Sequence, residues 1–494
     1  MSGINQPIGT EDPEYYAELF CKTRRLADWR LPDDERSCPD IPGIQGVDGL
    51  LSRRLQSLLD GVADISLCRR GNVSATMACL KNDKGTPETR LYVVFNHEDD
   101  ESARHCRQHL QTIFEMLRRV PNKPPAVDGS PKVIANELED YFIEICKAIH
   151  NYSFEIFAHR VSKREHKLSD IREFIEQDRT HFTTEQRSIL VNFLEHVHRI
   201  IMAVAKAQTT GQLSTTFIKM LLWKYSHWTE HDLLPKDSPA DKKVTLLDRA
   251  DLWLAEEHNI GFQLRRWALK IMSFLITANR LFILTQSHRL RKLLQGNFSV
   301  RVLTSPTTAP YYCDLSSKTI QVALDAAVAE ISNLPADWDQ KRESFIEWLS
   351  KKLEVSEVRQ KPKVHAELAM IIAMAKGEIK DVLPYVGVSK LSCIMCSHYI
   401  RAFNEVTKQK IATKGSHGKA YPGWSWPSLP DSDEELRPAF LRRIRQQLLS
   451  DVEQHAENLR RLSDSSMGSG GPEWQIGRTI DEIKELDDML DMEE

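Results

Sequence analysis

The sequence predicts an α/β core embedded in a mainly α-helical chain. Three observations support this fold class. Apolar residues recur at every third or fourth position through much of 101–297, which is the period of a helix that buries one face. Two strand-like runs, 73–80 and 90–96, flank a segment of turn residues, which indicates a β-hairpin. Finally, 362–406 alternates helix, short strand and helix, the pattern of an α/β unit.

Composition and charge exclude several classes of protein. Of the 494 residues, 41% are hydrophobic and 28% charged, so the chain can bury a core. Its net charge of −4 excludes a basic nucleic-acid coat protein; a nucleic-acid partner is possible, but the net charge does not support it. Residues 1–16 form no apolar leader, and Lys270 and Arg280 interrupt the apolar run 267–284, so we expect neither a secretory signal nor a membrane span. Nine thinly spread cysteines favour an intracellular protein, cytoplasmic or nuclear.

The first hundred residues divide into two expected segments. Residues 1–45 are polar and rich in proline, and we expect an irregular lead-in with one short helix near Glu14–Ala27. Residues 46–97 contain a helix at Val47–Leu59, where leucines form one stripe, followed by the hairpin.

The middle of the chain, 98–355, is expected to be a mainly helical insertion or a separate helical domain. The expected helices are 135–158, 185–207, 213–228, 243–257, 263–294 and 337–353. Two further runs, 299–303 and 318–324, look like strands on either side of a loop that contains proline. No repeat of fixed period is present, which argues against a solenoid.

The segment 356–430 is the expected catalytic core. Pro362 leads a helix at Val364–Lys376, and Gly377 ends it. A short strand at Val382–Val388 and a helix at Cys393–Val406 follow. An amphipathic helix, 431–462, and a flexible linker with an acidic tail, 463–494, complete the chain.

Four residues of this segment form the strongest chemical signal. His365 and Glu367 lie at the start of one helix, and Cys393 and Cys396 lie at the start of the next. In a compact α/β/α unit both helix starts lie at the same side of the sheet, and the positive ends of their dipoles favour thiolates. One imidazole and two thiolates suit Zn²⁺, and three protein ligands leave a fourth position for water. Glu367 would then act as the general acid and base.

These residues resemble a known family. His365-Ala-Glu367 followed by Pro384 and by Cys393-Ile-Met-Cys396 is similar to the zinc-dependent cytidine deaminase-like superfamily, and most like uncharacterised deaminase-domain proteins of fungi. The resemblance covers about 360–430 and implies that His365, Cys393 and Cys396 hold zinc while Glu367 moves protons. Ser392 stands where the superfamily usually has proline, and we expect it to cap the second helix.

The resemblance also implies a three-layer α/β/α core with a helix and a hairpin before the H-x-E helix. The near candidate is 299–324, and the far candidate is 47–96, which fits better. The core would then be discontinuous, with the helical region inserted. By the same resemblance Asn96 would contact substrate, although an asparagine at a hairpin end is commonly turn chemistry.

The expected function is hydrolytic deamination of a nucleobase-containing substrate, with Zn²⁺ as the cofactor. His417 and Trp424, in a loop rich in glycine, proline and tryptophan, are expected substrate contacts; the alternative is that this loop only packs on the domain. The alternative for the metal is a closed structural site with His398 as the fourth ligand. The alternative function is a catalytically inactive zinc-containing scaffold, and a homo-oligomer is possible. A second H-x-E triplet, His455-Ala-Glu457, is interpreted as a solvated helix surface.

Overall fold

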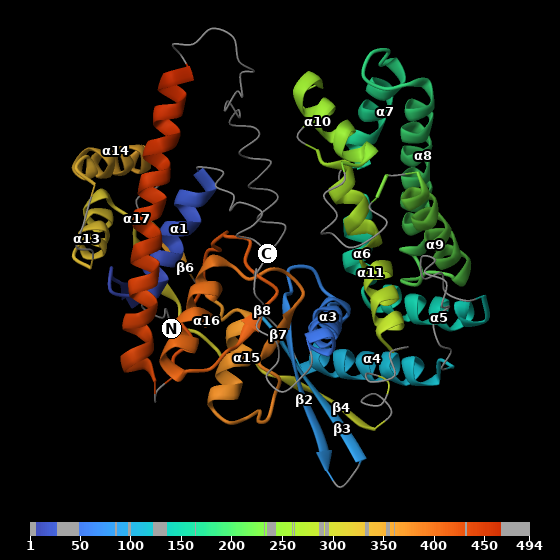
Figure 1. Cartoon of the computed structure of the whole chain (residues 1–494), viewed down its shortest axis with the longest axis horizontal. Coiled ribbons are helices and arrows are strands. Elements are labelled where there is room, and N and C mark those ends of the chain that lie inside the picture. The colour runs from blue at the N-terminus through green and yellow to red at the C-terminus, as the bar shows by residue number, and fades with distance from the viewer. Residues whose placement is uncertain are drawn as a thin grey trace. The chain divides into compact units, whose positions relative to one another are not determined.

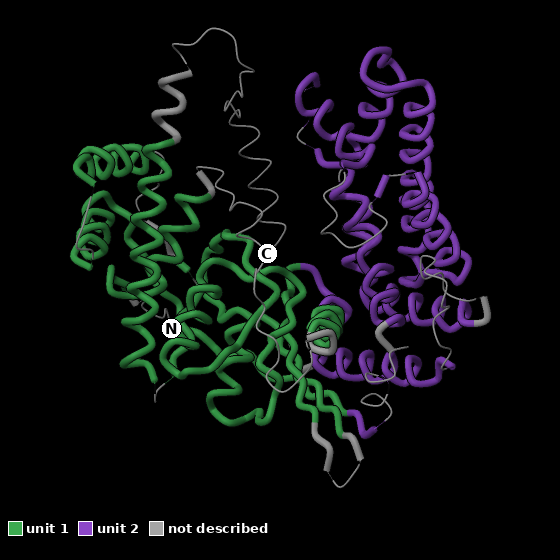
Figure 2. Tube along the Cα trace, in the orientation of Figure 1, with its two compact units in different colours: residues 1–63, 71–100, 299–494 green, residues 64–70, 101–298 purple. Residues whose placement is uncertain are grey.

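The computed structural model divides the chain into two compact units. Unit 1 comprises residues 1–63, 71–100 and 299–494, and unit 2 comprises 64–70 and 101–298 (Figure 2). The residues that the structure describes are 6–26, 49–83, 86–96, 100–121, 136–163, 165–231, 233–234, 244–258, 260, 262–285, 291, 296–330, 335–351, 356–359, 361–429 and 432–465.

Unit 1 is built on a five-stranded sheet with the order β4-β3-β2-β7-β8. Strands β2 and β3 form the expected hairpin, in which Ser74 pairs with Phe95. Strand β2 also pairs antiparallel with β7, which in turn pairs parallel with β8. The bounds are β2 Ser74–Asp83, β3 Thr86–Phe95, β4 Asn297–Leu303, β7 Tyr385–Val388 and β8 Ala412–Thr413. Both the far hairpin and one strand of the near candidate therefore belong to the same sheet.

Helices lie on both faces of this sheet (Figure 1). Alternate residues of β2 point to opposite sides, as strand geometry requires. The Thr76 hydroxyl donates to the carbonyl oxygen of Leu59 in α3, Gly49–Ile65. On the other face Met77 is buried in the cluster that contains the apolar residues of α15, Ala366–Ala375, and α16, Ile394–Thr407.

The remaining elements of unit 1 extend this core. A second sheet has the order β1-β5-β6, from Gln6–Ile8, Tyr311–Asp314 and Ser356–Arg359. Helix α17, Asp433–Ser465, packs with three further helices of unit 1: α1 Pro13–Leu26, α13 Ser317–Val328 and α14 Trp338–Ser350. Buried residues of α1, α13, α14 and α17 share one cluster with α15 and α16, so the N-terminus and the C-terminal helix stabilise the same core.

Unit 2 is helical. Its elements are α4 Asp100–Arg119, α5 Asn136–Tyr152, α6 Phe154–Ser162, η1 Glu165–Lys167, α7 Leu168–Gln177, α8 Thr184–Ala207, α9 Thr215–Glu230, α10 Leu246–His258 and α11 Leu264–Thr285. Helix α8 begins with a capping box, in which Thr183 accepts from Gln186 and Gln186 accepts from Thr183. Alone among the described helices, α8 is long and apolar enough to cross a membrane, but 44% of its most apolar window is buried in the protein.

The structure corrects four expectations. Residues 318–324 are helical, because Ser316 caps α13 and Ile320, Ala323 and Leu324 follow a helical period. The separate helical unit ends at residue 298 rather than 355, because the helices α13 and α14 belong to unit 1.

The other two corrections concern burial near the chain ends. Segment 1–45 is more than an irregular lead-in: β1 joins a sheet, and the expected short helix is α1, which buries Tyr15 and Phe20 completely. His455 is not solvated but lies against Trp348, with ring centroids 4.5 Å apart. Most of the expected tail, 466–494, lies outside the described residues.

Candidate metal centre

The starts of α15 and α16 bring one imidazole and two sulfurs together. His365 is the residue before α15, and Cys393 is the residue before α16. His365 Nδ1 lies 3.4 Å from Cys393 Sγ and 3.3 Å from Cys396 Sγ, and all three ligand atoms lie within 4.8 Å of one another. No other group of metal-binding side chains of this kind occurs in the part of the chain that the structure describes. We call these residues the His–Cys–Cys cluster.

The donor set and the spacing fit a tetrahedral zinc ion. With Zn–N and Zn–S bonds of about 2.0 and 2.3 Å, tetrahedral geometry separates nitrogen from sulfur by about 3.5 Å. The two observed distances from His365 Nδ1 are close to this value. Both cysteines are buried, whereas His365 is half-buried, so the cluster is approached from the side of the histidine.

Local electrostatics favour a thiolate in the cluster. Burial opposes ionisation of Cys393, but the hydrogen bonds from Cys396 and the charge of His365 hold the pKa of Cys393 well below its usual range. The backbone N–H of Cys396 donates to Cys393 Sγ at 3.4 Å, so this sulfur also caps α16. Ser392 does not take the expected capping role; its hydroxyl lies 3.5 Å from that of Thr413.

Glu367 lies beside the cluster without joining it. Its side chain is buried, and Oε2 has no hydrogen-bond partner. Burial raises the pKa of Glu367, and the opposing charge of His365 does not cancel this rise. A buried carboxylate oxygen without a partner is costly unless something absent from the protein itself bonds to it. This orphaned oxygen therefore points to a bound water or substrate at the cluster.

A loop of residues 415–426, called the site loop, borders both ligand-bearing segments. The N–H of Lys363 donates to the carbonyl of Gly423 at 2.7 Å, and the N–H of Ser425 donates to the carbonyl of Lys363 at 3.0 Å. On the other side, the N–H of Ile394 donates to the carbonyl of Lys419 at 2.9 Å. The site loop is thus hydrogen-bonded next to His365 and next to Cys393.

Within the site loop the two expected substrate residues behave differently. Trp424 is fully buried and stacks on Phe440, with ring centroids 5.8 Å apart; a substrate contact by Trp424 stays a prediction. His417 is half-buried and lies 3.2 Å, through Nε2, from the hydroxyl of Tyr421. The Tyr421 ring lies 6.1 Å from the ring of His365. Tyr421 was not singled out in the sequence, although a tyrosine in that loop is a ready stacking surface.

The side chain of Asn96 forms hydrogen bonds to the backbone beside the hairpin. Its Oδ1 accepts from the N–H of Val73 at 2.8 Å, and its Nδ2 donates to the carbonyl of Gly71 at 3.4 Å. A substrate contact by Asn96 stays a prediction. His398 is buried away from the His–Cys–Cys cluster, where burial lowers its pKa to about 3, so among the described residues no fourth protein ligand closes the cluster.

A buried glutamate of α1 holds the site loop from the side away from the ligands. Glu18 is fully buried, and its Oε1 accepts from the N–H of Gly423 at 2.8 Å. Arg359 pairs with both Glu18 oxygens at 2.9 and 2.8 Å, and the Tyr311 hydroxyl donates to Oε1 at 2.8 Å. Sequence reasoning missed Glu18, because no local pattern shows that its partners lie hundreds of residues away.

Two further side chains of α1 contact the same loop. Arg24 forms a buried two-point ion pair with Asp451 and donates to the carbonyl of Gly418 at 2.7 Å. Glu14 accepts from the N–H of Trp426 at 2.7 Å. We call these three residues the α1 clamp: Glu14, Glu18 and Arg24. The candidate site therefore depends on a helix at the opposite end of the sequence.

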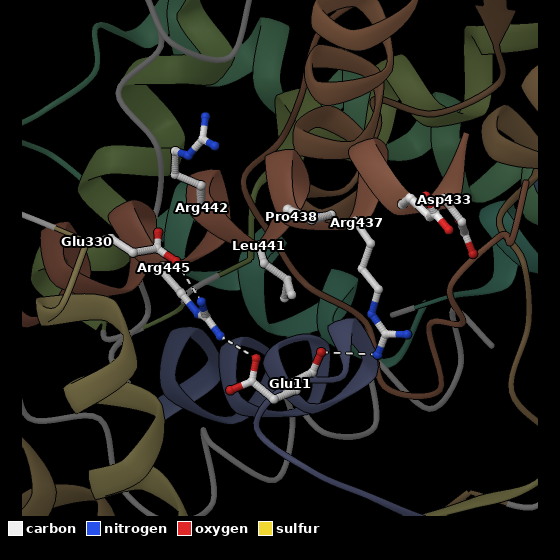
Figure 3. Close-up of a pocket in the computed structure, with 9 residues that line it drawn as sticks. Glu11, Glu330, Asp433, Arg437, Pro438, Leu441, Arg442 and Arg445 are labelled. Carbon is white, nitrogen blue, oxygen red and sulfur yellow. Dashed lines mark hydrogen bonds and ion pairs between the residues drawn. The ribbon is translucent and has the colours of Figure 1, made fainter. Parts of the chain in front are cut away.

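Unit 1 also has a pocket at a different place. A charged depression is lined by residues of α17 and by Glu11 and Glu330 (Figure 3). Arg445 pairs there with Glu11 at 2.9 Å and with Glu330 at 2.6 Å. None of the cluster residues lines it, and its central arginine is already neutralised by these carboxylates.

One comparison with known proteins returns a match. A family model described as OTT_1508_deam-like deaminase matches residues 364–428, about one eighth of the chain, and this range contains His365, Glu367, Cys393 and Cys396. No curated protein and no solved structure matches the chain. Residues 364–428 are therefore deaminase-like, with a cluster of side chains able to bind a metal ion.

Proposed function

We propose that this protein is a zinc-dependent hydrolytic deaminase that acts on a nucleobase-containing substrate. The observation that carries the proposal is the unpartnered Oε2 of Glu367 beside the His–Cys–Cys cluster. A purely structural metal site needs no buried carboxylate next to it. A hydrolytic site needs one, because protons must move between water, ring nitrogen and leaving amine.

The proposed reaction exchanges an amine for oxygen. A water oxygen bonds to the ring carbon that carries the exocyclic amine, the carbon–nitrogen bond breaks, and ammonia leaves. Zinc held by His365, Cys393 and Cys396 would supply an activated water with a pKa near 7. Glu367 would take the first proton of the attacking water and give it to the ring nitrogen. It would then carry the second proton, from the newly formed hydroxyl group, to the departing amine, which leaves as ammonia. Its burial suits this role, because a raised pKa makes the carboxyl group a stronger proton acceptor that can still return the proton.

The fold supports a discontinuous catalytic core. The hairpin from 46–97 pairs with β7 of 356–430, and α3 and α15 lie on opposite faces of that sheet. We propose that these two segments together form the three-layer α/β/α core. Unit 2 then stands as a helical insertion between β3 and β4 of this core.

An ammonia-release screen tests the proposed function. Wild-type protein, Glu367→Gln and Glu457→Gln are compared over nucleosides, nucleotides and short oligonucleotides, with zinc content measured in parallel. Glu457 belongs to the second H-x-E triplet and is exposed, so it is the matched control. We expect Glu367→Gln to keep its zinc and lose turnover by about 100-fold or more, while Glu457→Gln matches wild type. Bound zinc without ammonia from any compound would favour the scaffold alternative instead.

A further inference from the structure

Three chain segments meet at the side of the sheet where the His–Cys–Cys cluster lies. They are 361–365 before α15, 389–393 before α16, and 413–424, which includes most of the site loop. Backbone hydrogen bonds join them, because Lys363 bonds to Gly423 and the N–H of Ser392 donates to the carbonyl of Gly415 at 3.0 Å. The half-buried His365 lies at the end of the first of these segments.

The three segments carry an unusual charge. They hold five lysines and no aspartate or glutamate, although the whole chain has a net charge of −4. We call these lysines the lysine rim: Lys361, Lys363, Lys390, Lys414 and Lys419. By contrast, acidic residues follow the far ends of the same helices, with Glu378 and Asp381 after α15 and Glu405 in the last turn of α16.

Four of the five rim lysines have no carboxylate partner among the described residues. Within the described part of the chain, no ion pair involves Lys361, Lys363, Lys414 or Lys419. The acidic residue closest in sequence, Glu367, is buried at the cluster. The glutamates of the α1 clamp are engaged by backbone N–H groups of the site loop and, in the case of Glu18, by Arg359.

Helix geometry adds to this positive charge. Both α15 and α16 begin at the cluster, so the positive ends of two helix dipoles face the same space as the lysines. A surface with one sign of charge around a recessed site raises the local concentration of ligands with the opposite charge. Phosphate is the anion that accompanies a nucleobase in nucleotides and in nucleic acids.

We infer that the substrate of this site carries phosphate close to the reacting base and that the lysine rim binds this phosphate. The inference deepens the proposed function and depends on it for the reaction, but binding can be measured without turnover. The shared chemistry, a base with an adjacent phosphate, is found both in free nucleotides and in oligonucleotides. Separate arms of the test distinguish these two sources.

The test compares full-length wild type with two double variants. Lys363→Gln/Lys419→Gln removes two rim charges next to the ligand-bearing segments. Lys376→Gln/Lys380→Gln removes two charges from exposed positions beyond the far end of α15 and is the matched control. Zinc content and thermal unfolding establish that each variant is folded. Ammonia release is measured for nucleosides, their 5′-monophosphates and short single-stranded oligonucleotides.

The expected result is a change in KM confined to phosphorylated substrates. The rim variant should raise KM for them about tenfold, leave kcat and the values for nucleosides unchanged, and show a weaker dependence on salt. The control variant should match wild type. A preference for monophosphates identifies free nucleotides as the source, whereas a preference for oligonucleotides with a steep salt dependence identifies the nucleic-acid backbone.

The remaining outcomes separate this inference from the proposed function. Equal kcat/KM for nucleosides and phosphorylated substrates, unchanged in the rim variant, overturns the inference and leaves the deaminase intact. If no compound releases ammonia, binding of a fluorescent 5′-phosphorylated oligonucleotide is measured by anisotropy. Binding that the rim variant loses and the control keeps supports the phosphate site and contradicts the deaminase. No binding overturns both.

Discussion

Units 1 and 2 bury polar groups in different ways. In unit 1, buried ion pairs join residues that are far apart in the sequence, as in Glu18 with Arg359 and Arg24 with Asp451. Glu18 and Arg24 form hydrogen bonds to the site loop, and Arg359 and Asp451 pair with these two side chains. The buried charges of unit 1 therefore fix the position of a loop next to the candidate metal centre, a role that an apolar core could not fill.

In unit 2, a buried aspartate forms hydrogen bonds to nearby backbone groups, and buried histidines are uncharged. Asp178 accepts from the N–H groups of His181 and Phe182, a few residues along the chain. His109 and His150 are buried, and burial lowers their pKa values to about 3 and about 4. The ion pair between Arg172 and Glu195 is exposed. Among the described residues, the buried long-range ion pairs lie in the unit with the site, whereas the ion pairs of unit 2 are at least partly exposed.

The largest expected effect comes from Glu18→Gln in unit 1. The substitution removes the charge that Arg359 faces, and breaking a buried ion pair costs about 3 kcal/mol or more. We expect faster amide hydrogen exchange in the site loop and a lower free energy of unfolding for unit 1. The exposed pair of unit 2 is the control, because Glu195→Gln should cost less than about 1 kcal/mol. Equal losses in the two variants would contradict the comparison.

Gly387→Ala tests the close contact between α3 and the sheet. A Cβ at this position would lie 2.4 Å from the carbonyl carbon of Leu59, so α3 must move away from β7. Overpacking of this kind costs about 3 kcal/mol. In unit 2, Gly211→Ala meets no atom within 4 Å and costs only the strain of a positive φ, about 1 kcal/mol. Chemical denaturation, with amide hydrogen exchange followed separately in each unit, measures the loss in the free energy of unfolding for both variants.

Zinc should stabilise unit 1 alone. A ligand that binds only the folded state raises the free energy of unfolding by about 2.7 kcal/mol at a concentration 100-fold above Kd. The His–Cys–Cys cluster lies entirely in unit 1, so exchange in unit 2 should not respond to added zinc or to a chelator. Cys396→Ser should abolish the response. Slower hydrogen exchange in unit 2 on addition of zinc would indicate a second zinc site, and the two units would then not differ in their response to the metal.

Unit 2 should lose stability as pH falls. His109 and His150 have lowered pKa values in the folded state, so below about pH 6.5 the unfolded chain binds protons that the folded unit does not. Each histidine then costs about 1.4 kcal/mol per pH unit until its folded pKa is approached. In unit 1, burial also lowers the pKa values of His398 and His455, so they contribute with the same sign. His109→Phe should make the pH profile of unit 2 shallower, as followed by thermal unfolding between pH 7 and 4.5.

The smallest effect is expected at a helix cap. Thr183→Ala removes the capping box of α8 and should cost about 1 kcal/mol, confined to unit 2. In unit 1 the corresponding cap of α16 is Cys393, so replacing that residue by serine changes the metal centre as well as the cap. A loss well above this value for Thr183→Ala would show that unit 2 depends on its caps more than on its packing.

Local pattern predicted the helices of unit 2 and the hairpin well, because apolar spacing reports the local backbone. The prediction was wrong at 318–324, which is helical rather than a strand. The local signal for this helix is Ser316, whose side chain caps its first turn. For the site, the sequence correctly predicted that His365, Cys393 and Cys396 lie close together. The prediction was possible because these residues lie at the starts of two helices that are separated by only one short strand.

The sequence could not reveal the α1 clamp. Glu14, Glu18 and Arg24 resemble the solvent-facing residues of an ordinary amphipathic helix. Their partners, such as Gly423 and Asp451, lie about 400 residues away, and only the tertiary fold brings them into contact. For the same reason the sequence could not show that Trp424 is buried and stacks on Phe440.

The order of strands in the main sheet has a consequence for how the protein is made. Strand β2 is synthesised early, but its neighbour β7 follows about 290 residues after the end of β3. At about 5–20 residues per second, a ribosome needs about 15–60 s to reach β7. During that interval one edge of the nascent hairpin has no partner strand, and unpaired edges are where chains aggregate. Chaperone demand during translation should therefore be greatest before residue 385 emerges.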